Sequence, residues 1–518
     1  GPGTPFPAEL RGVALGTWNW FWGRPYPGDS EKLRALTRLV APGVLRVAGG
    51  NWANDVTWDP TSAQCYPRPL YSGCQRQTLT PPLSGWDTCG PTPTPVPDAY
   101  RLTLQPDELL DLADLAADVG ADLMLQVNAA TCDPAQWAEV IRWANIEQGL
   151  GIRYVEIGNE FDLGRHLDGR DVPTGADYAA RYLLYHDALS AVDPALEFVG
   201  PAASQHEEDP TFLAMSDLVL PLLDDPDVQL DRLDWLSWHL YPWYNGDHPV
   251  TAADLLSWGS PADLRTRAHL DHCAPEKRNW LDARGLSTTR IALTEVAGIV
   301  VGEPTLLNVN HAGALWFADA LPRLAASGVD MAILWQLYDD PLDTSFGMIT
   351  RGSSLAWYDP SAGVDVVDDR FHPLPAFYTY AMLAHLFGDE LVPTTSSRSD
   401  LSVWASRDPA RPEDLWLLVV NLSPDPIAAT IGLGGWIPQL GARQWTLRNP
   451  AFNAALDAES VLEGTTLQGQ QLDTSSAAAI AASWAAIVNS PTTYVLSGSG
   501  LLRTFEPYSV NAILLDDR

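Results

Sequence analysis

The chain has 518 residues, of which 46% are hydrophobic, and a formal net charge of −34. This length exceeds that of one ordinary domain and allows a full hydrophobic core. So negative a surface would repel phosphate, which argues against nucleic acid or an anionic membrane as a partner. No apolar run reaches the length of a membrane span, so we expect a soluble protein.

Short β-rich runs alternate with amphipathic helical patterns along the first three quarters of the chain. This alternation is typical of a parallel sheet built from βα units. The predicted strands are 12–17, 44–49, 121–128, 152–158, 196–201, 234–240, 290–296 and 330–337. The clearest helical patterns are 30–40, 105–119, 134–148, 174–192 and 307–326. Eight βα units predict an α/β fold, the (β/α)8 or TIM barrel, over residues 1–390.

The first βα connection is unusually long. Residues 50–104 lack a strong helix or strand pattern and contain Cys65, Cys74 and Cys89. Loops of this length are usually functional or disordered, and we expect this one to wall a substrate cleft on the catalytic face. One disulfide within it would suit an oxidising compartment, whereas the irregular spacing disfavours zinc. The Gly-Pro-Gly-Thr-Pro start is interpreted as a processed N-terminus of a secreted or extracellular protein, with a cytoplasmic location left open.

The pattern changes after Gly388. Short runs there alternate or are continuously apolar, with turn residues between them, at 401–406, 414–422, 427–433, 443–448 and 508–515. This spacing predicts an all-β sandwich over residues 391–518. The Ala-rich stretch 475–488 fits one helix packed on that sandwich.

Two predicted barrel strands end in a carboxylate. Strand four leads into Gly158-Asn159-Glu160, and strand seven ends at Glu295. The carboxyl ends of barrel strands form the catalytic face. Retaining hydrolysis of a glycosidic bond needs one carboxylic acid to protonate the leaving oxygen and one carboxylate to attack the anomeric carbon, roughly 5–5.5 Å apart. Strands four and seven lie about opposite each other in such a barrel, so the pair predicts this chemistry.

Other strand ends carry residues that would support the two carboxylates. Arg46 lies in an apolar strand, where it needs a carboxylate partner and would lower the pKa of a nearby nucleophile. Glu156 is interpreted as a structural carboxylate paired with Arg46 or Arg153. Alternation places His239 and Tyr241 on one face of strand six, where the phenol could donate to the nucleophile. The alternative for Arg46 is a purely structural ion pair, and the alternative for His239 is a histidine packed in the core.

Further candidates would bind the substrate. Asn128 ends strand three, and Trp335 and Gln336 end strand eight. The chain has 21 Trp residues, several of which, including Trp18, fall in loops of the predicted catalytic face. An indole there provides a flat apolar surface with one hydrogen-bond donor. Core packing is the alternative for Trp335.

These motifs resemble those of the clan A retaining glycoside hydrolases. The resemblance implies that Glu160 is the acid/base, Glu295 the nucleophile and Asn159 a ligand of the sugar 2-hydroxyl. Segments 45–51, 156–160, 238–241 and 373–378 are most similar to family 79, which contains β-glucuronidases and heparanases. Families 39 and 51, with xylosidases and arabinofuranosidases, share much of the pattern. The near absence of an N-terminal β-rich extension departs from it.

The expected activity is therefore glycoside hydrolysis by double displacement through a glycosyl-enzyme intermediate, with no cofactor and no metal. A carbohydrate is the expected partner, and the sequence does not indicate an oligomeric state. A β-glucuronide would need a cation for its carboxylate, for which Arg165, His166 and His206 are candidates by loop position. The alternatives are an endo-acting glycanase, an α-L-arabinofuranosidase or β-xylosidase of the same clan, a transglycosylase, and a non-catalytic carbohydrate-binding protein.

Overall fold

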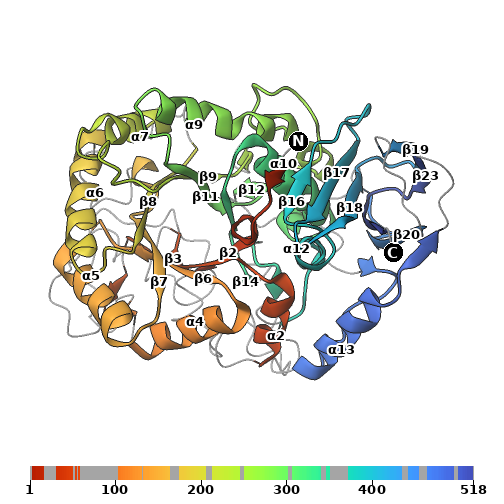
Figure 1. Ribbon diagram of the computed structural model, residues 1–518, viewed down its shortest axis with the longest axis horizontal. Coiled ribbons are helices and arrows are strands. Elements are labelled where there is room, and N and C mark those ends of the chain that lie inside the picture. Colours follow the sequence, from red (N-terminus) through yellow and green to blue (C-terminus); the bar gives the residue numbers. More distant parts are fainter. Residues whose placement is uncertain are drawn as a thin grey trace, which may run out of the picture.

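A computed structural model shows a closed parallel barrel beside an antiparallel sheet (Figure 1). The predicted (β/α)8 barrel with a C-terminal β domain is confirmed. The structure describes residues 3–16, 31–50, 53–54, 56–58, 103–104, 106–130, 132–163, 174–205, 213–244, 250–300, 306–339, 346–350, 371–433, 441–453, 464–494 and 500–516. Within these ranges, no helix is both long and apolar enough to cross a membrane.

All eight predicted barrel strands are present. In barrel order they are β11 (Arg290–Val296), β13 (Met331–Leu334), β2 (Gly12–Gly16), β3 (Val44–Gly49), β6 (Asp122–Val127), β7 (Ile152–Ile157), β8 (Glu197–Ala203) and β9 (Trp235–Leu240). Their side chains alternate between two cores, because successive residues of a strand face opposite sides. On β3, Val44 belongs to the core inside the barrel, whereas Leu45 and Val47 pack outward in the main core.

Helices surround the barrel. They are α2 (Glu31–Val40), α4 (Pro106–Val119), α5 (Pro134–Ile141), α6 (Gly175–Ser190), α7 (Met215–Asp224), α9 (Cys273–Asp282), α10 (His311–Ser327) and α12 (Pro375–His385). The sequence sets several of their ends. Thr174 and Asp177 form a capping box at the start of α6. Gly328, with a φ of 104°, ends α10 in the left-handed conformation that glycine adopts at no steric cost.

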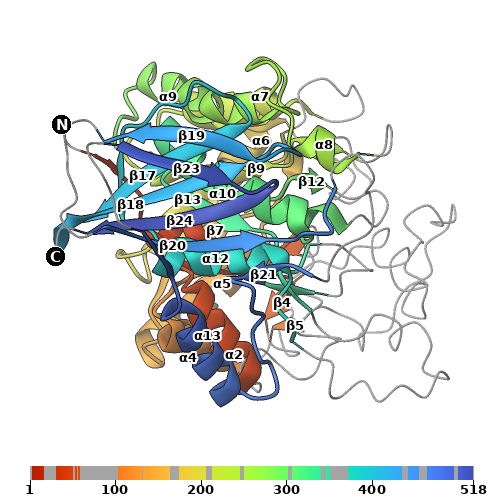
Figure 2. The same cartoon turned by 90° about the vertical axis from the view of Figure 1, so that its right-hand side faces the viewer.

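The C-terminal domain has one large antiparallel sheet and one small one. The large sheet runs β1 (Thr4–Pro5), β16 (Glu390–Val392), β17 (Leu401–Asp408), β18 (Arg411–Asn421), β24 (Ser509–Asp516), β20 (Gly441–Arg448) and β21 (Thr466–Leu467), with β22 (Thr492–Tyr494) also on β20. The small sheet pairs β19 (Ile427–Gly432) with β23 (Gly500–Phe505). The Ala-rich stretch forms the expected helix, α13 (Ala477–Val488), but this helix packs beside α2 of the barrel rather than on the sandwich (Figure 2).

The centre of the large sheet is buried on both faces. On β18, Leu417 and Val419 pack toward the small sheet, whereas Leu418 and Val420 join the core that contains the barrel helices. In Figure 2 this sheet covers α10 and α12. Because β1 belongs to this sheet, the first residues of the chain extend the second domain, which the predicted division at residue 390 did not include.

Little of the long loop lies within the described residues. Although residues 50–104 carry no strong strand pattern, β4 (Thr57–Trp58) pairs in parallel with β5 (Thr103–Leu104). Cys65, Cys74 and Cys89 lie outside the described residues, so a bridge among them stays a prediction. Cys132, just after β6, is disulfide-bonded. Among the described cysteines, Cys273 is buried and free.

Candidate active site

Glu295 faces the barrel interior because β11 is irregular near its end. The pairing of β11 with β9 shifts by one residue between Leu293 and Glu295. Without that shift, alternation would turn Glu295 toward the surrounding helices, the side on which Leu293 packs. A one-residue bulge of this kind re-aims the side chains that follow it. The side chain of Glu295 is 5% exposed.

Glu160 is held by an unusual turn after β7. Its φ is 46°, in the left-handed region that non-glycine residues rarely adopt. Gly158, two residues earlier, has a φ of 82° and lies so close to the Phe161 ring that a Cβ there would overlap it. The backbone N–H of Glu160 donates to the carbonyl of Ala202, at the end of β8, over 2.9 Å. This turn directs a side chain that is 12% exposed, more than that of Glu295.

Both carboxylate oxygens of Glu295 accept hydrogen bonds. Oε1 lies 2.8 Å from a guanidinium nitrogen of Arg46 and 3.2 Å from the backbone N–H of Gly50. The Tyr241 hydroxyl donates to Oε2 over 2.6 Å. Burial by itself raises the pKa of Glu295, but the charges of His239 and Arg46 and the Tyr241 hydrogen bond outweigh burial and hold that pKa below its usual range.

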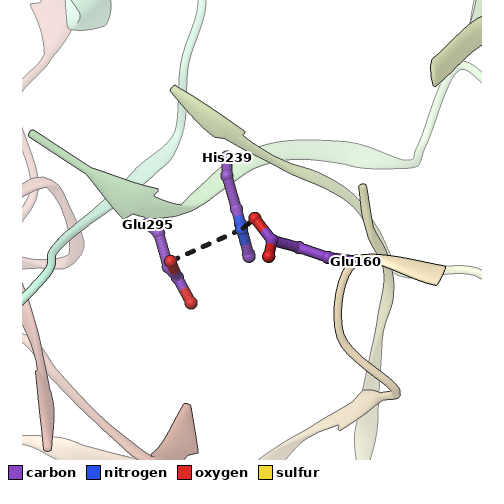
Figure 3. A group of neighbouring side chains, drawn as sticks. All are labelled: Glu160, His239 and Glu295. Atoms are coloured by element: carbon purple, nitrogen blue, oxygen red, sulfur yellow. Dashed lines mark hydrogen bonds and ion pairs between the residues drawn. The ribbon is translucent and has the colours of Figure 1, made fainter. Parts of the chain in front are cut away.

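His239 lies between the two carboxylates, as Figure 3 shows. Its Nδ1 is 2.8 Å from Oε1 of Glu160 and 3.5 Å from Oε2 of Glu295. Burial lowers the pKa of His239, but the charges of Glu295 and Glu160 reverse this effect and raise it. One oxygen of each carboxylate and the imidazole nitrogen all lie within 4.8 Å of one another. The imidazole therefore links two acids that face each other across the barrel mouth.

Arg46 connects this pair to the barrel interior. Its Nε lies 2.7 Å from Oε2 of Glu156, the partner that the sequence suggested. A second guanidinium nitrogen donates to Oδ1 of Asn159 over 3.0 Å. Gly49 leaves room for this arrangement, because a Cβ there would overlap both Arg46 and Trp335. Arg46 and Glu156 are both fully buried.

The other residues predicted to bind substrate differ in their contacts with the carboxylate pair. Trp335 is 4% exposed and lies with its ring centroid 6.0 Å from the Arg46 guanidinium carbon. Gln336 accepts a hydrogen bond from the backbone of Gly16. Asn128 bonds the backbone at Val56 and Ala130, and none of these hydrogen bonds joins it to the carboxylate pair. Outside the described residues are Trp18, Arg165, His166 and His206.

Gln126 precedes Asn128 at the end of predicted strand three, which was expected to supply amides to the site. It donates to Oδ1 of Asn159 and to the carbonyl of Gly158. Asp162 and Ser204 were not among the predicted residues. Asp162 is fully buried and accepts from the N–H and hydroxyl of Ser204. Burial raises the pKa of Asp162 to about 7, opposed by the Ser204 hydrogen bonds.

Glu160, His239 and Glu295 are also the His and carboxylate groups, among the described residues, that lie close enough together to hold a metal ion. The sequence predicted no metal. Both oxygens of Glu295 already bond to Arg46 and Tyr241. A cation there would face the buried Arg46 charge, so the donor set suits a metal poorly.

The chain is similar in structure to several glycoside hydrolases. The α-L-arabinofuranosidase of Thermotoga maritima superposes with a TM-score of 0.62 and 16% identity, over 99% of this chain and 98% of that one. The family 51 α-L-arabinofuranosidase AbfB of Bifidobacterium longum gives 0.65 and 16%, over 99% and 97%. A family 44 xyloglucanase of Paenibacillus polymyxa gives 0.57 and 16%, over 100% and 97%.

These likenesses establish the fold. The barrel and the C-terminal sheet are shared over nearly the whole length of each chain. No protein-family model and no curated protein matches the sequence.

Proposed function

We propose that this protein is a retaining glycoside hydrolase of clan A, with Glu295 as nucleophile and Glu160 as acid/base. The observation that carries the proposal is the pair of carboxylates after β7 and near the end of β11, with one oxygen of each within 4.8 Å of the other. Retaining enzymes place their two carboxyl groups about 5–5.5 Å apart, whereas inverting enzymes leave roughly 6.5–9.5 Å for a water molecule. The spacing supports retention.

The environments of the two acids suit different roles. Glu295 is nearly buried, and its lowered pKa keeps it ionised as an attacking group. Glu160 is more exposed and contacts His239, so it can exchange a proton with a leaving group or with water. In the first step, Glu295 attacks the anomeric carbon while Glu160 gives its proton to the departing glycosidic oxygen.

In the second step, Glu160 acts as a base. It takes a proton from water, whose oxygen attacks the anomeric carbon and breaks the bond to Glu295. The sugar leaves with its original anomeric configuration, and both carboxyl groups return to their starting protonation. Each step thus needs only the two carboxyl groups and water, which is why we propose no cofactor.

Asn159 is proposed to bind the sugar 2-hydroxyl. Its Oδ1 accepts from both Arg46 and Gln126. These two bonds fix the rotation of the amide, so that the group it offers to a hydroxyl is the Nδ2 donor. A hydrogen bond to the 2-hydroxyl that strengthens in the transition state can supply several kcal/mol. Trp335 and Gln336 are proposed to line the same subsite, and Asn128 and Trp18 remain proposed substrate contacts.

The substrate class proposed is a glycoside of a plant or microbial glycan. The solved structures that resemble the chain include arabinofuranosidases, which makes an α-L-arabinofuranoside the first sugar to try. Because several sequence segments resemble family 79, a β-glucuronide is the second sugar to test. We further propose that the protein is secreted, because Cys132 is disulfide-bonded and such bonds persist in oxidising compartments.

The test is hydrolysis of a panel of aryl glycosides with the Glu295→Ala protein as blank. The panel contains α-L-arabinofuranoside, β-xyloside, β-glucuronide, β-glucoside and β-galactoside, followed by arabinan, xylan and xyloglucan. Activity on at least one substrate that the variant lacks is the expected result. Folded wild-type protein that binds a glycan by calorimetry but cleaves none of them would establish the carbohydrate-binding alternative instead.

A further inference from the structure

Residues 202–205, which comprise the last two residues of β8 and the two that follow them, contact both sides of the site. We call them the β8 strap. β8 lies between β7, which leads to Glu160, and β9, which leads to Tyr241. The strap itself contributes no group to the carboxylate pair. Its contacts with the two neighbouring strands are of different kinds and reach different members of the pair.

The first side of the strap holds the Glu160 turn. Ala202 accepts from the backbone N–H of Glu160, and both residues have positive φ values, 51° and 46°. Two residues further on, the Ser204 N–H lies 3.0 Å from one oxygen of Asp162, and the Ser204 hydroxyl lies 2.5 Å from the other. A backbone in so sparsely populated a conformation persists only when its surroundings fix it. The Asp162–Ser204 pair fixes the turn two residues beyond Glu160.

The second side of the strap holds Tyr241. Oε1 of Gln205 accepts from the backbone N–H of Tyr241 over 3.0 Å. Nε2 of Gln205 donates to the Tyr241 carbonyl. One side-chain amide thus pairs with both backbone groups of the residue whose hydroxyl lies 2.6 Å from Oε2 of Glu295. Tyr241 follows β9 directly, so no strand pairing of its own fixes it within the described residues.

We propose that Ser204 and Gln205 are positioning residues with separate targets. Ser204 sets the acid/base Glu160 through Asp162, and Gln205 sets the nucleophile Glu295 through Tyr241. Neither touches the reacting atoms. Catalytic groups must be held within about 0.5 Å of their productive geometry, and a misplacement of about 1 Å can cost roughly 100-fold in rate. The inference rests on the proposed function, because it divides the work between the two proposed catalytic acids.

The separation can be measured with two leaving groups. A poor leaving group needs the proton from the acid/base, whereas a good one leaves without it, and both need the nucleophile. The probes are the phenyl and 2,4-dinitrophenyl glycosides of the sugar that the wild-type protein cleaves, beginning with α-L-arabinofuranose. The quantity compared is kcat/KM, which reports the first step.

Ser204→Ala should lower kcat/KM for the phenyl glycoside by about tenfold or more and leave the dinitrophenyl glycoside within about twofold of wild type. Ser204→Thr, which keeps a hydroxyl, should restore most of the loss. Gln205→Ala should lower kcat/KM for both probes by similar factors. It should also move the acidic limb of the pH profile upward, because a displaced Tyr241 no longer stabilises the Glu295 anion.

Two matched controls separate positioning from loss of stability. Ser406 is a buried serine whose Oγ accepts from the Gly388 N–H over 2.8 Å, in the C-terminal domain. Gln468 bridges backbone groups there as Gln205 does near the site, with Oε1 2.9 Å from the Thr446 N–H and Nε2 3.1 Å from the Gln444 carbonyl. Ser406→Ala and Gln468→Ala should lower the melting temperature without altering the ratio of the two kcat/KM values.

The outcomes separate the positioning roles from the proposed function. Wild-type protein that cleaves no glycoside overturns the function, and the positioning roles with it. Active wild-type protein, with Ser204→Ala affecting both probes equally or neither, overturns the role of Ser204 alone. A preference of Gln205→Ala for one leaving group, or an unmoved acidic limb, overturns the role of Gln205.

Discussion

Among the described residues, one cluster of arginine and carboxylate lies at the barrel mouth and another, largely buried, lies between the barrel and the C-terminal sheet. In the second, Arg267 and Arg323 both bond to Asp319, and Arg323 also meets Asp271 at 2.9 Å. The indole N–H of Trp404, on β17, donates to Asp319 over 3.1 Å. Two positive and two negative charges balance, and the cluster joins α10 to the C-terminal sheet.

The cluster at the barrel mouth is not balanced in this way. Arg46 meets Glu156 and Glu295, and Glu160 adds a third carboxylate that faces His239. Buried charge is costly unless it is paired, so an excess of acid at a barrel mouth points to chemistry. The comparison indicates that a buried ion cluster should be interpreted from its charge balance and position, because burial is common to both.

The largest expected effect is a loss of activity that occurs only when the cluster at the barrel mouth is changed. Glu295→Gln should lower kcat by at least about 10⁴-fold, because the nucleophile is lost while the side chain keeps its size. Circular dichroism should change little, and the fall in melting temperature should be smaller than that of Asp319→Asn. Asp319→Asn is the matched change in the other cluster, and protein that remains folded should retain its kcat. A Glu295→Gln enzyme that remains active would show that the cluster at the barrel mouth is not catalytic.

The cluster between the domains should contribute to stability rather than to activity. Asp319→Asn should lower the free energy of unfolding by about 3–5 kcal/mol, because Arg267 and Arg323 then stay buried without their shared carboxylate. Burial raises the pKa of Asp319, but the charges of the two arginines outweigh it and hold that pKa far below its usual range. Denaturant unfolding at neutral pH measures the loss. An unchanged midpoint would show that this cluster does not join the domains.

Arginine at the barrel mouth should not be replaceable by lysine. Arg46→Lys should lower kcat/KM by about 100-fold, because one ammonium cannot meet Glu156, Asn159 and Glu295 with three separate nitrogens. Arg323→Lys is the control, and it should weaken the fold while leaving kcat/KM near the wild-type value. Equal kinetic losses in both variants would contradict the assignment of the two clusters.

A smaller effect is expected in the pH dependence of kcat/KM, which reports the pKa of Glu295. The first step needs ionised Glu295, so the acidic limb of kcat/KM should lie below the usual range of a glutamate. Tyr241→Phe removes a donor to the anion, which raises this pKa, moves the limb to higher pH and lowers kcat/KM by about tenfold. Tyr182→Phe loses a hydroxyl bond to the Arg232 carbonyl and should not move the limb.

The lowered pKa of Glu295 also makes the stability of the fold depend on pH. Since the folded-state pKa of Glu295 is lowered, its ionisation stabilises the fold above the unfolded-state pKa, and this contribution is lost as the pH falls through the folded-state value. The pKa of His239 is raised, so its contribution is present at low pH and is lost as the pH rises through its folded-state value. In acid titrations of stability, Tyr241→Phe should show a smaller loss than wild type.

The smallest expected effect is that of a chelator. Dialysis against EDTA should leave kcat/KM unchanged, because the proposed steps use only Glu160, Glu295 and water. Restoration of lost activity by a divalent cation would instead show that Glu160, His239 and Glu295 hold a metal.

The barrel was predictable from sequence because each of its strands is a short apolar run followed by an amphipathic helix. Arg46 and Tyr241 were recognisable for a similar reason, as polar residues at inward positions near strand ends. The strands β4 and β5 were missed because each has only two residues, too few for any periodic pattern.

The orientation of the catalytic pair was less predictable. Glu295 reaches the interior through a register shift in β11, and strict alternation would have turned it outward. Glu160 depends on a left-handed turn, and the contacts of Asp162 with Ser204 and of Gln205 with Tyr241 depend on where that turn and the end of β8 meet. Such contacts between separate strands leave no spacing signal in the sequence.

The most direct test of the account is the configuration of the first sugar released, followed by proton NMR during hydrolysis of the best aryl glycoside of the panel. The spacing of Glu160 and Glu295 predicts that the product first appears with the anomeric configuration of the substrate and only later equilibrates. First release of the opposite anomer would mean that water attacks directly. That result would contradict Glu295 as the nucleophile.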